Sequence, residues 1–168
     1  MSRAFVKEPD GDETADEQPE IPVSPHPNYV TPQGLAALRA EHAHLMAEKT
    51  RLGEAPKELE DKLTLRQAER RLRYVTQRIE HAILVDPAKQ PLGEVAFGAA
   101  VTVRDADGKK RTYTITGEDE ADAAAGKVSY VSPLARALKG AAVGDFVTWK
   151  RPAGDTELEI LKIAYEKT

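Results

Sequence analysis

Two stretches decide the fold prediction: Gly117-Glu118-Asp119-Glu120-Ala121-Asp122 and, ten residues later, Ser132-Pro133-Leu134-Ala135-Arg136-Ala137-Leu138. In the second stretch, Ser132 can cap a helix by accepting a backbone N–H, and Pro133 suits the first helical position. Gly140 suits the left-handed residue that follows a helix end. We therefore predict an acidic turn beside a helix of about two turns, which together favour a docking surface for a partner.

Short runs rich in β-branched and aromatic residues surround these stretches and predict the strands of a small sheet. Turns are indicated at Asp105–Gly108 and Arg151–Asp155, which combine Asp with Gly or Pro. Together with the helical region described below, the pattern indicates an α+β fold. The expected strands are Val95–Phe97, Val101–Arg104, Arg111–Thr116, Val128–Val131, Phe146–Lys150 and Leu158–Ile163.

The order of several motifs between Val95 and Tyr165 resembles the C-terminal domain of the GreA/GreB bacterial transcript-cleavage factors. The resemblance implies an FKBP-like β half-barrel with one short helix, preceded by an antiparallel helical hairpin that enters the secondary channel of RNA polymerase. It also implies that the acidic turn and the helix start, through Glu118, Asp119, Glu120, Ser132 and Pro133, bind the rim of that channel. The motifs that carry the resemblance are Phe97–Val103, Gly117–Asp122, Ser132–Arg136 and Val143–Asp145.

The region before this domain has the pattern of the expected coiled-coil hairpin. Thr31 is a good N-cap and Pro32 a good first helical residue, so a first helix is predicted from Pro32 to about Leu52. Apolar residues follow at spacings typical of a coiled coil, and the second helix is predicted to end near Leu84. The apolar positions are Leu35, Leu38, Leu45 and Leu52 in the first helix and Leu65, Ala68, Leu72, Val75, Ile79 and Ala82 in the second.

The reversal between the helices is predicted between Gly53 and Glu60, because Gly53 and Pro56 disfavour a helix interior. Carboxylates therefore crowd this tip, and helix ends attract them through the helix dipole alone. The resemblance implies a further role, in which tip carboxylates help to hold Mg²⁺ in the polymerase active centre while backtracked RNA is hydrolysed. The protein would then be an accessory factor with no catalytic residue of its own. The tip carboxylates are Glu54, Glu58, Glu60 and Asp61.

The tip also departs from the family pattern. Lys57 stands where the pattern has an acid, and the second carboxylate is displaced by a residue to Glu58. The hairpin is about a dozen residues shorter than the pattern, which reduces its reach by about 8 Å at 1.5 Å per residue. A non-cleaving regulator or inhibitor that occupies the secondary channel is therefore an alternative to a cleavage factor.

Three arginines in the second helix, Arg66, Arg70 and Arg73, follow spacings of four and three and share one helical face. Guanidinium groups bind phosphate and carboxylate in a forked geometry, so this arginine face could contact the 3′ end of nascent RNA or the channel wall. The alternative is a solvated face paired with neighbours such as Glu69.

The first twenty residues carry seven acids against Arg3 and Lys7, and prolines recur from Pro9 to Pro27, so residues 1 to about 20 are predicted to be disordered. This acidic arm could shield the arginine face or dock on a basic polymerase surface, although solvation alone also explains it. Ile21–Tyr29 could pack as a strap on the hairpin base. We divide the chain into an N-terminal extension with its strap (1–30), a hairpin (31–85), a linker (86–94) and a C-terminal domain (95–168).

Composition excludes several other classes. The net charge of −4 gives no strongly basic DNA-binding surface, and the absence of cysteine excludes disulfides and thiolate zinc sites. No run of eighteen apolar residues and no signal peptide is found, so a cytoplasmic protein without membrane contact is expected. A third hypothesis is a plain interaction module that uses the half-barrel on another partner, including a prolyl-isomerase role. That role needs a cleft walled by several aromatic residues, and those of the C-terminal domain are spread along its strands.

Overall fold

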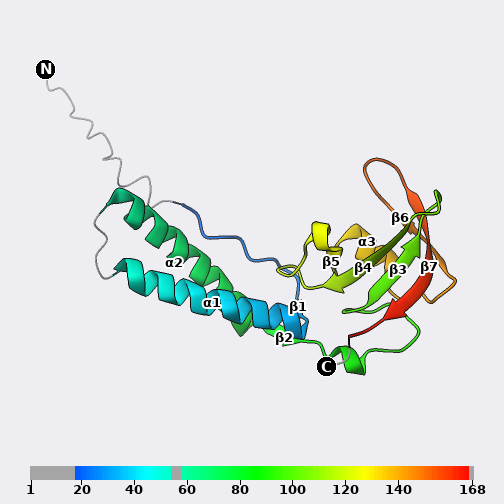
Figure 1. Ribbon diagram of the computed structural model, residues 1–168, viewed down its shortest axis with the longest axis horizontal. Coiled ribbons are helices and arrows are strands. Elements are labelled where there is room, and N and C mark those ends of the chain that lie inside the picture. The colour runs from blue at the N-terminus through cyan, green and yellow to red at the C-terminus, as the bar shows by residue number, and fades with distance from the viewer. Residues whose placement is uncertain (1–17, 54–57, 167–168) are drawn as a thin grey trace, which may run out of the picture. The chain divides into compact units, whose positions relative to one another are not determined.

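The computed structural model describes residues 18–53 and 58–166 and falls into two compact units. The hairpin unit contains residues 18–25 and 39–80, as far as they are described, and the barrel unit contains residues 26–38 and 81–166. The start of the first helix therefore belongs with the barrel unit. We describe each unit by itself (Figure 1).

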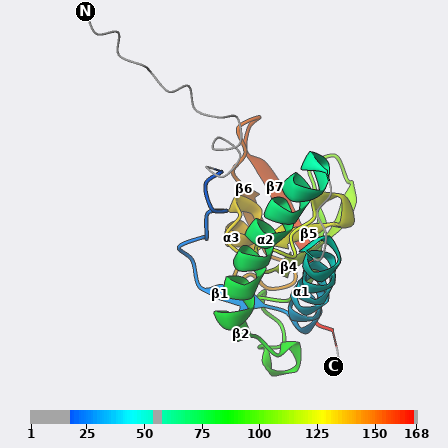
Figure 2. The ribbon, with the colours of Figure 1, turned by 90° about the vertical axis from the view of Figure 1, so that its left-hand side faces the viewer.

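The hairpin unit is built from two antiparallel helices, α1 (Pro32–Gly53, from Arg39 on) and α2 (Leu59–Glu80), which lie side by side in both views (Figures 1 and 2). Of the apolar positions predicted for the coiled coil, Leu45 and Leu52 of α1 and Ala68, Leu72 and Val75 of α2 are buried, whereas Leu65 and Ile79 are half-buried. Spacings of three, four and seven keep such residues on one side of a helix, where they can pack against the facing helix. The predicted hairpin is confirmed.

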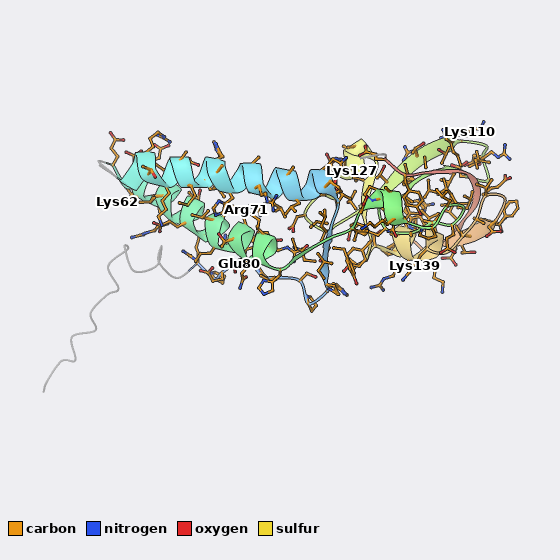
Figure 3. The ribbon with its side chains drawn as sticks, turned by 90° about the horizontal axis from the view of Figure 1, so that it is seen from below. Lys62, Arg71, Glu80, Lys110, Lys127 and Lys139 are labelled. Carbon is orange, nitrogen blue, oxygen red and sulfur yellow. The ribbon has the colours of Figure 1, made fainter. Side chains whose placement is uncertain are left out.

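An ion pair links the two helices beside the apolar seam. Arg71 of α2 donates from Nε and Nη2 to the two carboxylate oxygens of Glu41 in α1, the second bond measuring 3.1 Å. Figure 3 shows Arg71 on the side of α2 that faces α1. Both side chains remain more than a third exposed, so the pair adds at most about 1 kcal/mol and serves mainly to align the helices.

The predicted end of the second helix, near Leu84, is wrong. The helix ends at Glu80, and Ala82–Leu84 form strand β2, which pairs in parallel with β1 (Asn28–Val30). Val85 extends the contact by donating its N–H to the carbonyl oxygen of Val30, at 3.0 Å. The apolar spacing continues through Ala82, but the pairing with a segment far away in sequence decides the backbone conformation.

The barrel unit contains a curled, mixed five-stranded sheet in the order β5-β4-β3-β7-β6. The β3–β4, β3–β7 and β6–β7 pairs are antiparallel, whereas β4 and β5 are parallel. The predicted α+β half-barrel with one short helix is confirmed (Figure 1). The elements are β3 (Ala100–Arg104), β4 (Lys110–Thr116), β5 (Lys127–Ser129), β6 (Phe146–Trp149), β7 (Thr156–Ala164), α3 (Pro133–Leu138) and the 3-10 turns η1 (Pro87–Lys89) and η2 (Ala123–Ala125).

The core of the barrel unit lies between α3 and the sheet. Leu134, Ala135 and Leu138 of α3 are almost completely buried together with residues of three strands. Spacings of three and four place Leu134 and Leu138 on one face of α3, so a helix of only six residues can close one side of the core. The strand residues of this core are Val101, Val103, Ile115, Leu158 and Ile160.

Val95–Phe97, predicted as a strand, is an irregular segment in the structure. Its backbone bonds to the chain that follows α3, since Val95 donates to the carbonyl of Ala141 at 2.9 Å and accepts from Gly140 N–H at 2.8 Å. Val95 is buried in the core, which explains its apolar character. The apolar residues of this segment therefore indicate burial, and the strand predicted here is wrong.

The predicted cap of α3 is present. Ser132 Oγ accepts the N–H of Ala135 at 3.2 Å, Pro133 occupies the first helical position, and Gly140 follows the helix with a φ of 80°. These local interactions fix where the short helix begins and ends, and so where its apolar face meets the sheet.

We expect Ser132→Ala to lower stability by about 1 kcal/mol, because the Ala135 N–H loses its acceptor at the start of α3. This corresponds to a fall in Tm of about 2–4 °C, measurable by scanning calorimetry. Ser132→Thr keeps a hydroxyl and should stay close to the parent. Equal Tm values for the parent and the alanine variant would show that the cap is not needed.

Candidate functional site

The tip of the hairpin carries exposed carboxylates. Glu58 and Glu60 are exposed and Asp61 is half-buried, all at the start of α2, while Glu54 lies outside the described residues. In the described ranges, no three His, Asp or Glu side chains are grouped closely enough to hold a metal ion. The described tip residues thus do not form a metal site, and their carboxylates could add only one or two ligands to an ion held mainly elsewhere.

The predicted arginine face on α2 contacts the N-terminal arm, which we define as residues 18–25. Arg70 donates from Nε to the carbonyl oxygen of Pro19 at 2.7 Å. Arg73 forms a fork with Glu20, donating from Nε to both carboxylate oxygens at 3.1 and 3.0 Å and from Nη2 to one of them at 2.7 Å. Arg66, one turn earlier on α2, is half-buried.

The fork also shifts the ionisation of both partners. The hydrogen bond from Arg73 lowers the pKa of Glu20, and the same bond raises the pKa of Arg73. A carboxyl group with a lowered pKa keeps its pairing at every pH above its ordinary value and loses it as the pH falls through the lowered value. The contact between arm and helix is therefore fully ionised at neutral pH.

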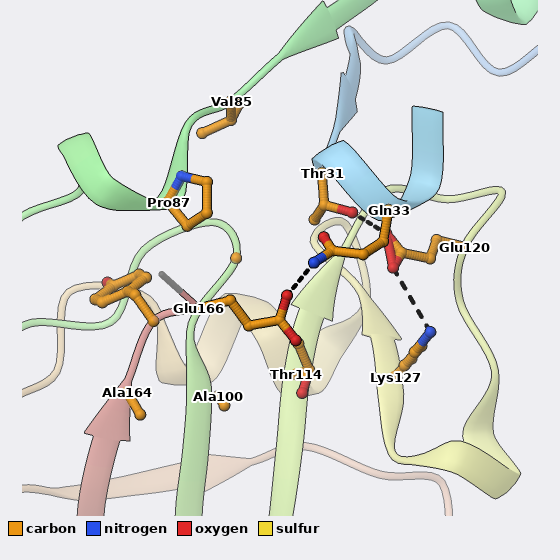
Figure 4. Close-up of a pocket in the computed structure, with 12 residues that line it drawn as sticks. Thr31, Gln33, Val85, Pro87, Ala100, Thr114, Glu120, Lys127, Ala164 and Glu166 are labelled. Carbon is orange, nitrogen blue, oxygen red and sulfur yellow. Dashed lines mark hydrogen bonds and ion pairs between the residues drawn. The ribbon is translucent and has the colours of Figure 1, made fainter. Parts of the chain in front are cut away.

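The acidic turn predicted as a docking surface makes contacts inside the barrel unit. The carboxylate of Glu120 accepts a hydrogen bond from the Thr31 hydroxyl and lies 3.7 Å from Lys127 Nζ (Figure 4). Thr31 in turn caps α1, accepting the N–H of Gly34 at 3.0 Å. Glu118 and Asp119 are half-buried and each also makes an interaction. Glu120 therefore joins the first residues of α1 to the sheet.

Gly117 lets this turn approach β1 closely. A Cβ atom at position 117 would lie 2.4 Å from the carbonyl oxygen of Tyr29, far inside van der Waals contact. The obstacle is backbone that is already paired with β2, so it cannot move aside as a flexible side chain could. Only glycine fits here without displacing β1 from the turn.

We predict that Gly117→Ala lowers the free energy of unfolding by about 1–3 kcal/mol, because the new methyl group collides with β1. Urea unfolding followed by Trp149 fluorescence will measure the change. The matched control is Gly53→Ala, whose Cβ meets no atom within 4 Å and which should be neutral or slightly stabilising. Equal losses in both variants would contradict the close approach.

Sequence reasoning missed an aromatic pocket in the barrel unit. Tyr29, Phe97 and Tyr130 converge with ring centroids 5.3 to 6.0 Å apart and line a pocket of about 520 Å³. The pocket continues to Val131 and to the exposed Arg136. The three rings come from segments far apart in sequence, so no spacing in the chain could have indicated it. The predicted contact residues Ser132 and Pro133 lie directly after Val131, and Pro133 is exposed.

A second, smaller pocket of about 220 Å³ lies where the start of α1 meets the sheet (Figure 4). Its walls include Thr31, Gln33, Glu120 and Lys127, and Gln33 also donates a hydrogen bond to Glu166. Thr31, Glu120 and Lys127 are linked to one another, so this pocket serves the joint between helix and sheet.

Within the described ranges, no helix is long and apolar enough to span a bilayer.

Comparison with known proteins gives the family. A family model described as "Transcription elongation factor, GreA/GreB, C-term" matches residues 89–165. Transcription elongation factor GreB of Neisseria meningitidis serogroup A is 37% identical over 155 residues, which cover 83% of this chain and 95% of that protein. Transcription elongation factor GreA of Psychrobacter arcticus is 36% identical over 153 residues, with 82% and 97% covered. A solved GreA/GreB factor from Nitrosomonas europaea has 20% identity and a TM-score of 0.41, covering 82% of this chain and 98% of its own.

The share of each chain that these alignments cover also bears on the family assignment. The alignment with GreB spans 155 residues but takes up only 83% of this 168-residue chain, so GreB has positions there without a counterpart here. Since the match nonetheless covers almost the whole of a relative that is more than one-third identical, the chain belongs to the GreA/GreB family of transcription elongation factors.

Proposed function

We propose that this protein binds RNA polymerase at the rim of its secondary channel and stimulates transcript cleavage in backtracked complexes. The observation that carries the proposal is a helical hairpin with an acidic tip, in a chain that aligns with 95% of a GreB. The polymerase remains the enzyme, and this protein acts as its accessory factor. It would work in the cytoplasm, where bacterial transcription takes place, without specific DNA binding.

The aromatic pocket and the start of α3 are our proposed contact with the polymerase. Binding energy at interfaces concentrates in pockets with aromatic walls, surrounded by a polar rim. Tyr29, Phe97 and Tyr130 form the walls, and Arg136 and Pro133 are exposed beside them. Ser132 and Glu120 would support this surface indirectly. Ser132 caps α3, and Glu120 holds the acidic turn against Thr31.

The tip is our proposed contribution to cleavage. Glu54 and Glu58, assisted by Glu60 and Asp61, would add one or two oxygen ligands to a Mg²⁺ ion that the polymerase holds mainly by itself. Such an ion can activate water and stabilise the leaving oxygen in phosphoryl chemistry. The arginine face of α2 would contact the phosphates of nascent RNA.

Arg136→Glu should weaken binding to core RNA polymerase by about tenfold, because it reverses the charge at the rim of the aromatic pocket. Affinity can be measured by competition with a labelled Gre factor. The matched control is Lys110→Glu, at an exposed residue of β4 that does not line the pocket. A pocket that is not the contact would give equal affinities for the two variants.

The tip is tested with a Glu54→Ala/Glu58→Ala double variant on a defined backtracked elongation complex at fixed Mg²⁺. We expect the parent to release short RNA and the double variant to do so about 100-fold more slowly, because the ion loses protein ligands. Polymerase affinity should not change. Lys62→Ala, which alters an exposed charge near the tip, serves as the control. Equal cleavage by the parent and the double variant would exclude the tip from the reaction.

A non-cleaving regulator of the secondary channel is the second candidate. Each helix has 22 residues and spans about 33 Å, and the sequence predicts a hairpin about a dozen residues shorter than the family pattern. A site that tolerates errors of about 0.5 Å is sensitive to such a loss of reach. Binding by the parent without RNA release, together with inhibition of a cleaving Gre factor, would favour this candidate. Absence of binding would overturn both.

A further inference from the structure

The most specific polar contact in the hairpin unit involves residues that the proposed function also uses. Arg73 and Glu20 meet through three hydrogen bonds of 2.7 to 3.1 Å, and the neighbouring Arg70 is held by the carbonyl of Pro19. Two guanidinium groups of the arginine face are thus bound by consecutive residues of the same arm. A merely solvated arm would not be expected to match two arginines that are three residues apart.

The contact imitates the way in which arginine binds phosphate. A guanidinium group presents parallel N–H donors, and a carboxylate or a phosphate accepts them through two oxygens. Glu20 occupies this fork on Arg73, and the Pro19 carbonyl accepts from Arg70 Nε. An RNA phosphate that used the same donors would have to displace the arm.

The contact between Arg73 and Glu20 is also exposed enough for another anion to displace it. The side chains of Arg73 and Glu20 are 57% and 63% exposed, so water and competing anions reach both. Exposed pairs of this kind contribute little to stability. The arm nevertheless remains tethered to the chain, and Pro19, Pro22 and Pro25 restrict its backbone, so Glu20 stays at a high local concentration near α2.

We propose that the N-terminal arm is an intramolecular competitor that covers the arginine face of α2 until the phosphates of single-stranded RNA displace Glu20 from Arg73. The inference rests on the proposed role of this face as an RNA contact. In the free protein the arginine face is bonded to the arm. RNA binds the face only where its phosphates are concentrated enough to displace the arm. An RNA phosphate replaces the Glu20 carboxylate on Arg73, and α2 itself does not need to move.

The test measures the Kd of the full-length protein for a 5′-fluorescein oligouridine of about 12 nucleotides by anisotropy, at about 50 mM salt. Four variants are compared with the parent: Glu20→Ala, Arg73→Ala, the double variant, and Glu80→Ala. The last removes an equal charge from an exposed position at the end of α2, away from the arm contact, and so corrects for net charge. Helical content of each variant is checked by circular dichroism.

We expect Glu20→Ala to bind the RNA about two- to fivefold more tightly than the Glu80→Ala control, and this gain to disappear in the Arg73→Ala background. If Arg73→Ala weakens binding but Glu20→Ala equals the control, the arm does not compete, and the proposed RNA contact stands. If Arg73→Ala has no effect even in the Glu20→Ala background, Arg73 does not bind RNA, and both the contact and the competition are overturned.

Discussion

The architecture depends on one long-range pairing, the parallel contact between β1 and β2. These strands directly flank the two helices, since β1 precedes α1 and β2 follows α2. Their pairing brings together two segments more than fifty residues apart, and it satisfies backbone groups that would otherwise be exposed before α1 and after α2. The acidic turn then packs against β1 at Gly117 and reaches Thr31 through Glu120.

This constraint gives the acidic turn a structural meaning that composition did not show. A run of carboxylates in a turn is commonly taken as a solvated or docking surface, and the turn was expected to dock a partner. Within the barrel unit, Glu120 also completes a short polar chain that runs from Lys127 to the cap of α1. Its charge is only slightly exposed, so it stabilises the joint from a sheltered position, and a partner would meet the surface that this joint supports.

The parts of the fold that local chemistry controls could be predicted from sequence. The cap of α3 at Ser132, the turn at Asp105 and the start of α1 at Thr31 all follow from side chains that bond to their own backbone neighbourhood. The end of α2 and the irregular path at Val95 could not, because distant strands and loops compete there with local preference. The aromatic pocket was missed for the same reason, since it joins segments that only the folded chain brings together. Composition suggested that the acidic arm could shield the arginine face, but it could not indicate that Glu20 pairs with Arg73.

The two proposed binding surfaces differ in the contacts that their side chains make when no partner is bound. The aromatic pocket is pre-formed, because its rings pack on one another and Tyr130 also donates a hydrogen bond to Pro27. The arginine face has no such rigid frame, and the arm supplies one carboxylate, from Glu20, and one carbonyl oxygen, from Pro19. A pre-formed pocket favours stable attachment, whereas a face satisfied by an exchangeable anion responds to the local concentration of competing phosphate. One chain can thus combine constant binding to a partner with conditional contact to RNA.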